Sequence, residues 1–360
     1  MSNHFDPFSY LTEFIFNVNM IKNKVWAVFL LGKNSFSYRL MKSNVNKTYK
    51  KAPYVAPSSN DPIQTSEKNG AKLSVAVWAD IQVSNYMFKR ARNFDAVCED
   101  IIKNVDGKLD AILVAGDMAE NGLLCEYQYM TDKLTGAKTE NFINAVGNHD
   151  VRLKVCYKNT VKRFCSFTNT LNKRVGSDLT IDSLHYSYEL NGYKFIVLGT
   201  DKTKFEESYF FEEQFAWLDS ELAEATKTGK PAFVICHQPF CYTHGLPDTW
   251  DIPIESAGSI GKQSDRVKAI LNKYENVFYL TGHLHNGIGK FTYEKIEKIN
   301  SVSLPALTMP NSNGDCNEIG IGFIMEVYDD HILFRARNFV KGEYLPDFDV
   351  DIPLCAMNVM

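Results

Sequence analysis

The sequence lacks several features that would narrow its class directly. None of its eight cysteines forms a C-x-x-C pair or a zinc-ribbon spacing, which argues against a cysteine-based metal or redox site. No apolar run approaches the roughly 20 residues that a transmembrane helix needs. Cysteines without a pattern in a chain of this size are expected to be reduced and mostly buried, which favours a cytoplasmic location. The formal net charge of -4 gives no overall attraction to nucleic acid.

Acidic residues are absent from Met20–Lys51, a stretch that holds eight Lys and Arg residues. Lys22 and Lys24 precede the apolar run Val25–Leu31, an arrangement similar to a signal peptide. That run is at the lower limit of length, however, and no small-x-small cleavage site follows it. We therefore expect a flexible or partly ordered basic arm. Secretion or membrane association through this arm stays an alternative.

Composition divides the chain into three parts. Residues 51–70 are rich in Pro, Ser, Asn and Gly, so residues 1–70 are expected to be an N-terminal arm and linker. Residues 71–350 are expected to form the main folded domain, and residues 351–360 a C-terminal tail. Residues 1–70 carry nine Lys/Arg against four Asp/Glu, whereas residues 71–360 carry 30 against 39. The folded domain is therefore acidic.

From residue 71 onward, patterns typical of strands and helices alternate. Three- and four-residue spacing predicts a helix that buries Met87, Ala91, Phe94, Cys98, Ile101 and Val105. A β-hairpin is predicted for Tyr186–Leu190 and Phe195–Leu198, joined by Asn191-Gly192. Further helices are expected over Phe211–Ala225 and Gln263–Lys273, and later strands over Val302–Leu307, Ile321–Val327 and Ile332–Arg337. This order predicts an α/β (α+β) fold of two mixed β-sheets flanked by helices.

Five short polar motifs each follow a predicted strand. The strands are Leu73–Ala79, Leu109–Ala115, Phe142–Val146, Ala232–Ile235 and Val277–Leu280. The motifs are Asp80-Ile81-Gln82, Gly116-Asp117, Gly147-Asn148-His149-Asp150, Cys236-His237 and Gly282-His283-Leu284-His285. Strand ends are where α/β folds gather side chains from distant parts of the sequence. The gathered oxygens and imidazoles are suited to two divalent metal ions.

This set of side chains predicts hydrolysis of a phosphate ester. Two cations about 3.5–4 Å apart orient a phosphate and offset charge on the attacking and leaving oxygens. One carboxylate must bridge both ions, and Asp117 is the best candidate because Gly116 leaves room for close approach. His149 and Asp150 are the predicted catalytic pair, since a neighbouring carboxylate would fix the tautomer of the imidazole and raise its pKa.

In this order, the motifs resemble those of the calcineurin-like metallophosphoesterase superfamily, over about residues 71–350. Gly147–Asp150 and Gly282–His285 are the most specific part of the resemblance. It implies a four-layer αββα sandwich, two divalent metal ions (Mn, Fe or Zn) and attack by a metal-bound hydroxide. One ion would be held by Asp80, Asp117 and His285, with Gln82. The other would be held by Asp117, Asn148, His237 and His283, with His149 as the phosphate-facing acid.

The first motif departs from the family pattern, because Gln82 stands where the family usually has a histidine. An amide oxygen is a weaker ligand than imidazole for Zn, Fe or Mn. Three alternatives stay open: Gln82 ligates weakly, holds a metal-bound water, or leaves the first ion loosely bound. The Asp-x-Gln motif is similar to that of the manganese-dependent ADP-ribose/CDP-alcohol diphosphatases.

Residues that contact the substrate are predicted less directly. His244 and Trp250 lie in the long connection Gln238–Lys262, and connections of this length are often binding loops. A Trp that anchors its own loop is an equal alternative for Trp250. Asn121, four residues beyond Asp117, completes the predicted set. The basic segment Val151–Arg174 is either a cap over the substrate or a solvated helix face.

The leading hypothesis is a dimetal phosphoesterase acting on a small phosphorylated substrate, either a phosphomonoester or a phosphodiester, with nucleotides included. One alternative is a nucleotide diphosphatase of the ADP-ribose/CDP-alcohol type or a cyclic-nucleotide diesterase. Another is a non-catalytic scaffold with the same fold. A nuclease that binds nucleic acid stably is disfavoured, because the domain is acidic. The sequence leaves the oligomeric state open.

Overall fold

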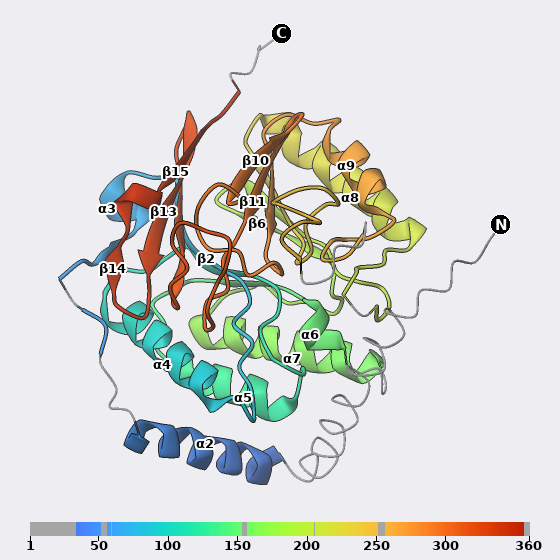
Figure 1. The fold of residues 1–360 in the computed structure, drawn as a ribbon. Coiled ribbons are helices and arrows are strands. Elements are labelled where there is room, and N and C mark those ends of the chain that lie inside the picture. Colours follow the sequence, from blue (N-terminus) through green and yellow to red (C-terminus); the bar gives the residue numbers. More distant parts are fainter. Residues whose placement is uncertain are drawn as a thin grey trace.

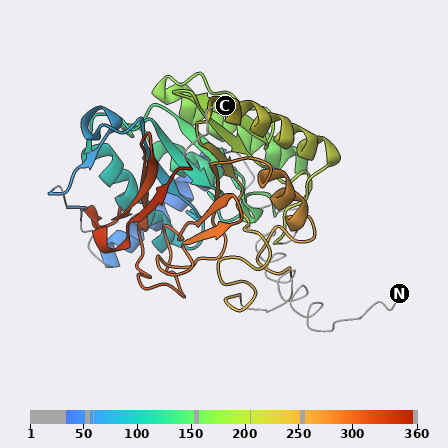
Figure 2. The same cartoon turned by 90° about the horizontal axis from the view of Figure 1, so that it is seen from above.

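The computed structural model describes residues 34–51, 56–58, 60–152, 157–204, 206–250 and 256–355, with side chains from Tyr38 onward. The apolar run Val25–Leu31 lies outside these residues. The described chain forms two large β-sheets that share a core, with helices on both outer faces (Figure 1). Figure 2 shows the same layers from above. This is the predicted four-layer αββα sandwich.

One sheet has seven strands, in the order β14-β13-β12-β2-β4-β5, with β15 paired to β13. Its strands are β2 (Leu73–Trp78), β4 (Ala111–Ala115), β5 (Phe142–Ala145), β12 (Ile321–Val327), β13 (His331–Asn338), β14 (Glu343–Tyr344) and β15 (Val350–Pro353). β2, β4 and β5 are parallel, so their carboxyl ends lie at one edge of the sheet. A separate two-stranded ladder joins β1 (Ile63–Gln64) to β3 (Val105–Asp106).

The other sheet has six strands, in the order β10-β11-β9-β8-β7-β6. They are β6 (Tyr186–Leu190), β7 (Tyr193–Val197), β8 (Ala232–Ile235), β9 (Val277–Thr281), β10 (Tyr293–Ile296) and β11 (Ile299–Ser303). β7, β8, β9 and β11 are parallel. The predicted hairpin β6–β7 is confirmed, with positive φ at Asn191 (52°) and Gly192 (78°), as a tight two-residue turn requires.

The six-stranded sheet packs against a hydrophobic core on each of its two faces, as strand β7 shows. Phe195 and Val197 belong to the core that both sheets share. Ile196 and Leu198 belong to a second core with Phe215, on the helix that covers this sheet. Because successive strand residues point to opposite faces, an unbroken apolar run buries both faces of a parallel sheet.

Helices cover the outer face of each sheet (Figure 1). The helices on the seven-stranded side are α4 (Phe88–Lys103), α5 (Leu124–Lys133) and α7 (Tyr157–Val175). Those on the six-stranded side are α8 (Glu212–Ala225) and α9 (Ser264–Leu271). Short helical turns are α3 (Ser66–Asn69), α6 (Asn148–Val151), η1 (Thr226–Thr228) and η2 (Pro346–Phe348). Among the described residues, no helix has the length and apolar character needed to cross a bilayer.

Helix α2 (Asn34–Lys51) lies outside α4 and α5 and adds a partial fifth layer (Figure 1). Met41 and Val45 on its inner face are buried, and the hydroxyl of Tyr49 donates a hydrogen bond to Asp95 of α4. Within the arm predicted to be flexible or partly ordered, this segment is an ordered helix packed on the domain.

Several predicted boundaries also need correction. The linker predicted over residues 51–70 contains β1 and α3, which pack on the domain. Part of the tail predicted at residues 351–360 pairs with β13 as the end of β15. The strand predicted over Val302–Leu307 is β11, which ends at Ser303, because Pro305 has no N–H to donate to a neighbouring strand.

Candidate metal centre

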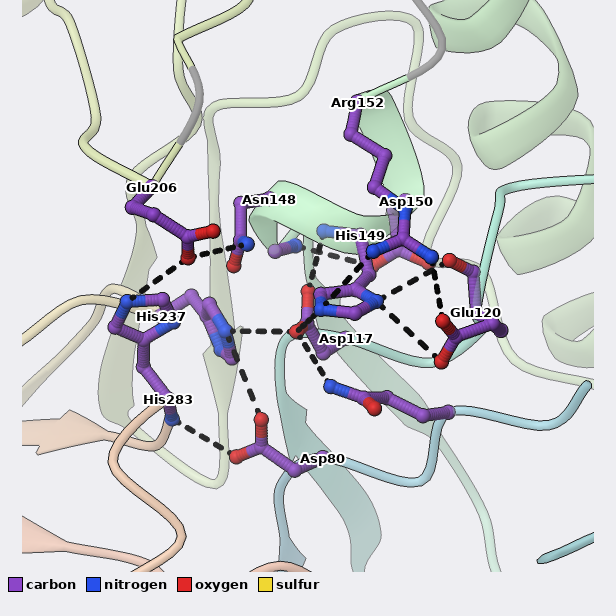
Figure 3. A network of polar contacts seen from close by, with 12 residues as sticks. Asp80, Asp117, Glu120, Asn148, His149, Asp150, Arg152, Glu206, His237 and His283 are labelled. Carbon is purple, nitrogen blue, oxygen red and sulfur yellow. Dashed lines mark hydrogen bonds and ion pairs between the residues drawn. The ribbon is translucent and has the colours of Figure 1, made fainter. Parts of the chain in front are cut away.

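The predicted metal residues come together where the two sheets meet at the carboxyl ends of their parallel strands (Figure 3). The side chains that follow strands of the seven-stranded sheet are Asp80, Gln82, Asp117 and Asn148. Those that follow strands of the six-stranded sheet are His237, His283 and His285. Strands far apart in the sequence thus supply one compact polar centre.

The backbone at this centre is left-handed at several positions. The φ angles are 50° at Asp80, 41° at Gln82, 53° at Asp117, 73° at His283 and 52° at His285. Residues other than glycine seldom adopt this conformation, which costs on the order of 1–3 kcal/mol each. It persists only where the surroundings fix it, and such residues cluster at functional sites. Five such residues at one centre therefore indicate a functional site.

Two glycines allow the strand ends to approach closely. A Cβ on Gly116, where φ is 93°, would lie 2.6 Å from Nδ1 of His237. A Cβ on Gly147 would lie 2.0 Å from Oδ1 of Asp117. A side chain at position 116 would therefore clash with the His237 ring, and one at position 147 would clash with Asp117, so both positions need glycine.

One group of ligand atoms has the character of a metal site. Asp117, His237 and His283 each place one ligand atom within 4.8 Å of the others. Nδ1 of His237 donates to the backbone oxygen of Ala115 at 2.8 Å, which leaves Nε2 to face the site. Within the described part of the chain, Oδ1 of Asn148 and Nε2 of His283 are buried without a hydrogen-bond partner, and Nε2 of His237 faces Oδ2 of Asp117 at 3.2 Å. A divalent ion would satisfy the first two, since buried polar atoms otherwise find partners.

The buried acidic and basic groups of this site shift one another's pKa values. Burial lowers the pKa of His237, but the carboxylates of Asp117 and Asp80 outweigh it and raise that pKa to about 10. Burial raises the pKa of Asp117, but His237 and His149 hold it well below its usual range. Burial and the neighbouring His237 lower the pKa of His283. Because a metal ligand must be deprotonated, an ion entering the site would displace the proton of His237.

A second group of ligand atoms surrounds Asp80. Its Oδ1 lies 3.0 Å from Nε2 of His285, and its Oδ2 accepts the backbone N–H of His283 at 2.8 Å. Gln82 is also present, but its Nε2 donates to Oδ2 of Asp117 at 3.0 Å. The amide nitrogen of Gln82 therefore faces the carboxylate of Asp117, whereas ligation of a metal ion would require the amide oxygen.

His149 borders both groups, but its partner differs from the predicted one. Its Nδ1 lies 3.2 Å from the backbone oxygen and 3.5 Å from Oε2 of Glu120. Its Nε2 lies 3.8 Å from Oδ2 of Asp117 and 3.4 Å from Nη1 of Arg152. Burial and Arg152 lower the pKa of His149, but Asp117 and Glu120 raise it by more. The prediction that Asp150 orients this ring is wrong, and Glu120 takes that place (Figure 3).

Asp150 has a structural role. Its carboxylate accepts hydrogen bonds from the backbone N–H groups of Met118, Ala119 and Gly147, and from the hydroxyl of Tyr127. It therefore ties the loop after β4 to the turn after β5.

The family model for calcineurin-like phosphoesterases matches residues 73–287, which is more than half of the chain. The chain belongs to the calcineurin-like phosphoesterase family. The predicted family, and with it the class of phosphate ester hydrolases, is confirmed.

Two individual proteins are similar to this family member. A probable cyclic nucleotide phosphodiesterase of Xenorhabdus bovienii (strain SS-2004) is 41% identical over 61 residues, which are 16% of this chain and 24% of that protein. The match thus spans about a quarter of the relative. The crystal structure of a dimetal phosphatase from Danio rerio has a similar fold, with a TM-score of 0.51 and 15% identity over 79% of this chain and 100% of that one.

Among the described residues, Trp250 is the one predicted substrate residue whose ring lies next to the candidate metal centre. Its ring stacks on His283, with centroids 4.8 Å apart and an interplanar angle of 27°. A Cβ on Gly258 would lie 2.7 Å from the Trp250 ring, so the loop packs tightly on its other side. Trp250 therefore supports a metal residue and anchors its own loop.

The other two predicted substrate residues are placed differently. His244 is fully buried, and its ring nitrogens pair at 2.7 Å with the backbone oxygen of Phe291 and with Oγ of Ser301. Both nitrogens are taken, so the prediction that His244 contacts the substrate is corrected. Asn121 is buried, and its Oδ1 accepts from Nη2 of Arg152 at 3.0 Å. Asn121 thus orients Arg152.

Several site residues carried no sequence motif. Oε2 of Glu206 accepts from Nδ2 of Asn148 at 3.0 Å, and burial raises the pKa of Glu206 to about 7. Glu120 forms ion pairs with Arg90 and Arg152. The one sequence signal for Glu120 is its position three residues after Asp117. Nothing in the sequence marked Glu206, which lies in an irregular loop.

The basic segment Val151–Arg174 divides between two environments. Arg152 reaches the site. Lys158, Lys162 and Lys173 are exposed along α7, as expected of a solvated helix face.

Proposed function

We propose that this phosphoesterase hydrolyses a small phosphodiester, with nucleotide diesters as the first class to test. The observation that carries the proposal is the convergence of His237 Nε2 and His283 Nε2 on Asp117, beside the buried Oδ1 of Asn148, which has no hydrogen-bond partner among the described residues. These atoms belong to motifs of a phosphoesterase family. The partial match to a probable cyclic nucleotide phosphodiesterase supports the diester class.

The donor atoms fit two divalent ions. One would be held by Asp117, Asn148, His237 and His283, and the other by Asp80, Asp117 and His285. This set of oxygens and imidazoles suits Mn, Fe or Zn. When bound, the ions supply positive charge that attracts the phosphate and offsets charge on the attacking and leaving oxygens.

His149 is the proposed proton donor. Its Nδ1 faces the backbone oxygen of Glu120, which can only accept, so Nδ1 carries a hydrogen and the ring orientation is fixed. Nε2 is thereby directed to the side of Asp117. In hydrolysis hydroxide from water bonds to phosphorus as the P–O bond to the leaving group breaks. His149, protonated on both ring nitrogens, gives its Nε2 proton to the leaving oxygen, and the proton that the attacking water releases to solvent restores the imidazolium.

A panel of substrates tests the proposed class. Bis-p-nitrophenyl phosphate, p-nitrophenyl phosphate, cyclic AMP and ADP-ribose would each be assayed with Mn, Zn, Mg or Fe. We expect kcat/KM to be highest for one of the diesters. Highest activity on ADP-ribose would favour the nucleotide diphosphatase instead. A protein that binds metal yet cleaves none of the four would be a scaffold.

The role of His149 has a separate test. His149→Asn should lower kcat about 100-fold for cyclic AMP, because positioned proton transfer contributes at least roughly that much. The same variant should keep most of its rate on bis-p-nitrophenyl phosphate, whose leaving phenolate needs no proton. Equal losses on both substrates would show that His149 binds the phosphate and does not act as an acid. His185→Asn, at a partly exposed histidine outside the site, is the control.

A further inference from the structure

Two carboxamide side chains face the metal centre, and charged neighbours turn them in opposite directions. Asn148 donates its Nδ2 hydrogen to the carboxylate of Glu206 at 3.0 Å. Since a carboxylate oxygen accepts this bond, the nitrogen of Asn148 must point outward and its Oδ1 inward. That oxygen is buried and has no hydrogen-bond partner among the residues that the structure describes. Glu206 therefore holds Asn148 ready as an oxygen ligand (Figure 3).

Gln82 has the opposite arrangement. Its Oε1 accepts from Nη1 of Arg90 at 2.8 Å, and its Nε2 donates to Oδ2 of Asp117 at 3.0 Å. Arg90 is itself held by Oε2 of Glu120 at 2.6 Å. A guanidinium has only donors, so turning the amide over would set two donors against each other and break both hydrogen bonds. Gln82 is buried, with 2% of its surface exposed, so water offers little compensation.

We propose that Arg90 makes the two metal sites unequal, by holding Gln82 as a hydrogen-bond donor to the bridging carboxylate instead of a metal ligand. The site of Asp117, Asn148, His237 and His283 has four protein ligands and binds its ion tightly. The site around Asp80 has three and exchanges its ion readily. Arg90 and Glu206 are positioning residues, because they act through the two amides. The inference rests on the proposed two-metal function.

The number and strength of bound ions test this inference. Full-length protein stripped of metal would be titrated with Mn²⁺ by calorimetry, and bound metal counted by elemental analysis. We expect two ions per chain, the second bound at least roughly tenfold more weakly than the first. Two ions of equal affinity would overturn the inference and leave the proposed function standing. Fewer than two ions at saturation would remove the basis of both.

Variants at position 82 distinguish a metal ligand from a hydrogen-bond donor. Gln82→Leu removes the amide. The affinity of the weaker site for Mn²⁺ should not fall, because Gln82 contributes no ligand to it. A loss of about tenfold or more would show that Gln82 ligates. Gln82→His supplies an imidazole and should strengthen the weaker site roughly tenfold or more. An unchanged affinity in the histidine variant would also contradict the inference.

Arg90 is tested in the same titration. Arg90→Met frees the amide of Gln82 to turn its oxygen inward, so the weaker site should gain affinity. Lys89→Met, at the exposed neighbouring position on α4, removes the same charge and should change neither site. Thermal unfolding of each variant checks that the fold is kept. A folded Arg90→Met protein with wild-type affinities would show that Arg90 does not control the site.

Discussion

Replacing Asp117 by Asn is expected to lower kcat for a phosphodiester by roughly 10³-fold or more, since metal charge contributes several kcal/mol to the transition state. Asp117 lies between both groups of ligand atoms, 3.2 Å from Nε2 of His237 and 3.0 Å from Nε2 of Gln82. Asparagine keeps the shape of this side chain but removes the charge that both ions share. Initial rates at saturating Mn²⁺, together with bound metal per chain, measure the effect.

His237→Ala should give a comparable loss, because it removes a ligand and empties the space beside Gly116. Asp265→Asn is the matched control, since this carboxylate is exposed and far along the chain from any motif. Its rate should equal that of the parent. Full activity in both Asp117→Asn and His237→Ala would refute the assignment of the site.

The sequence predicts which side chains gather at the candidate metal centre, because their position follows from a rule of topology. Parallel strands end at one edge of a sheet, so polar residues directly after apolar runs must gather there. Asp80, Asp117 and His237 are found on this basis alone. The same rule cannot reveal Glu206 or Arg90, which come from an irregular loop and a helix. Their positions depend on how the loop and α4 pack, which no local pattern records.

The error over His149 has a similar cause. Asp150 is its neighbour in sequence, but the Asp150 carboxylate is bonded to backbone N–H groups and to the hydroxyl of Tyr127. Glu120, which lies 29 residues earlier, contacts the ring instead. His244 was predicted from its place in a long loop, yet the loop folds inward and buries it. Adjacency along the chain is therefore a poor guide to contact wherever the backbone turns.

The strained backbone at the metal centre requires a rigid support. Left-handed φ angles at five positions of the metal centre cost free energy that the two cores must offset. Part of that support is the packing of α4 on the seven-stranded sheet, whose strand β13 is joined to α4 by a buried ion pair.

The second large effect concerns this ion pair, between Arg337 of β13 and Asp100 of α4. Both side chains are fully buried, and two hydrogen bonds of 2.8 Å join the guanidinium to the carboxylate. Arg337→Met should lower the free energy of unfolding by about 3–5 kcal/mol, because it leaves a buried carboxylate without its cation. Burial already raises the pKa of Asp100 despite Arg337, which shows how unfavourable this environment is for an isolated charge.

Urea denaturation of three variants tests this explanation. The double variant Arg337→Met/Asp100→Leu should recover much of the loss, since apolar side chains of similar volume often replace a buried ion pair without cost. Arg266→Met, which breaks an exposed ion pair with Glu212, should leave the midpoint close to that of the parent. If the double variant is no more stable than Arg337→Met, the loss comes from packing around Arg337 and not from the unpaired charge.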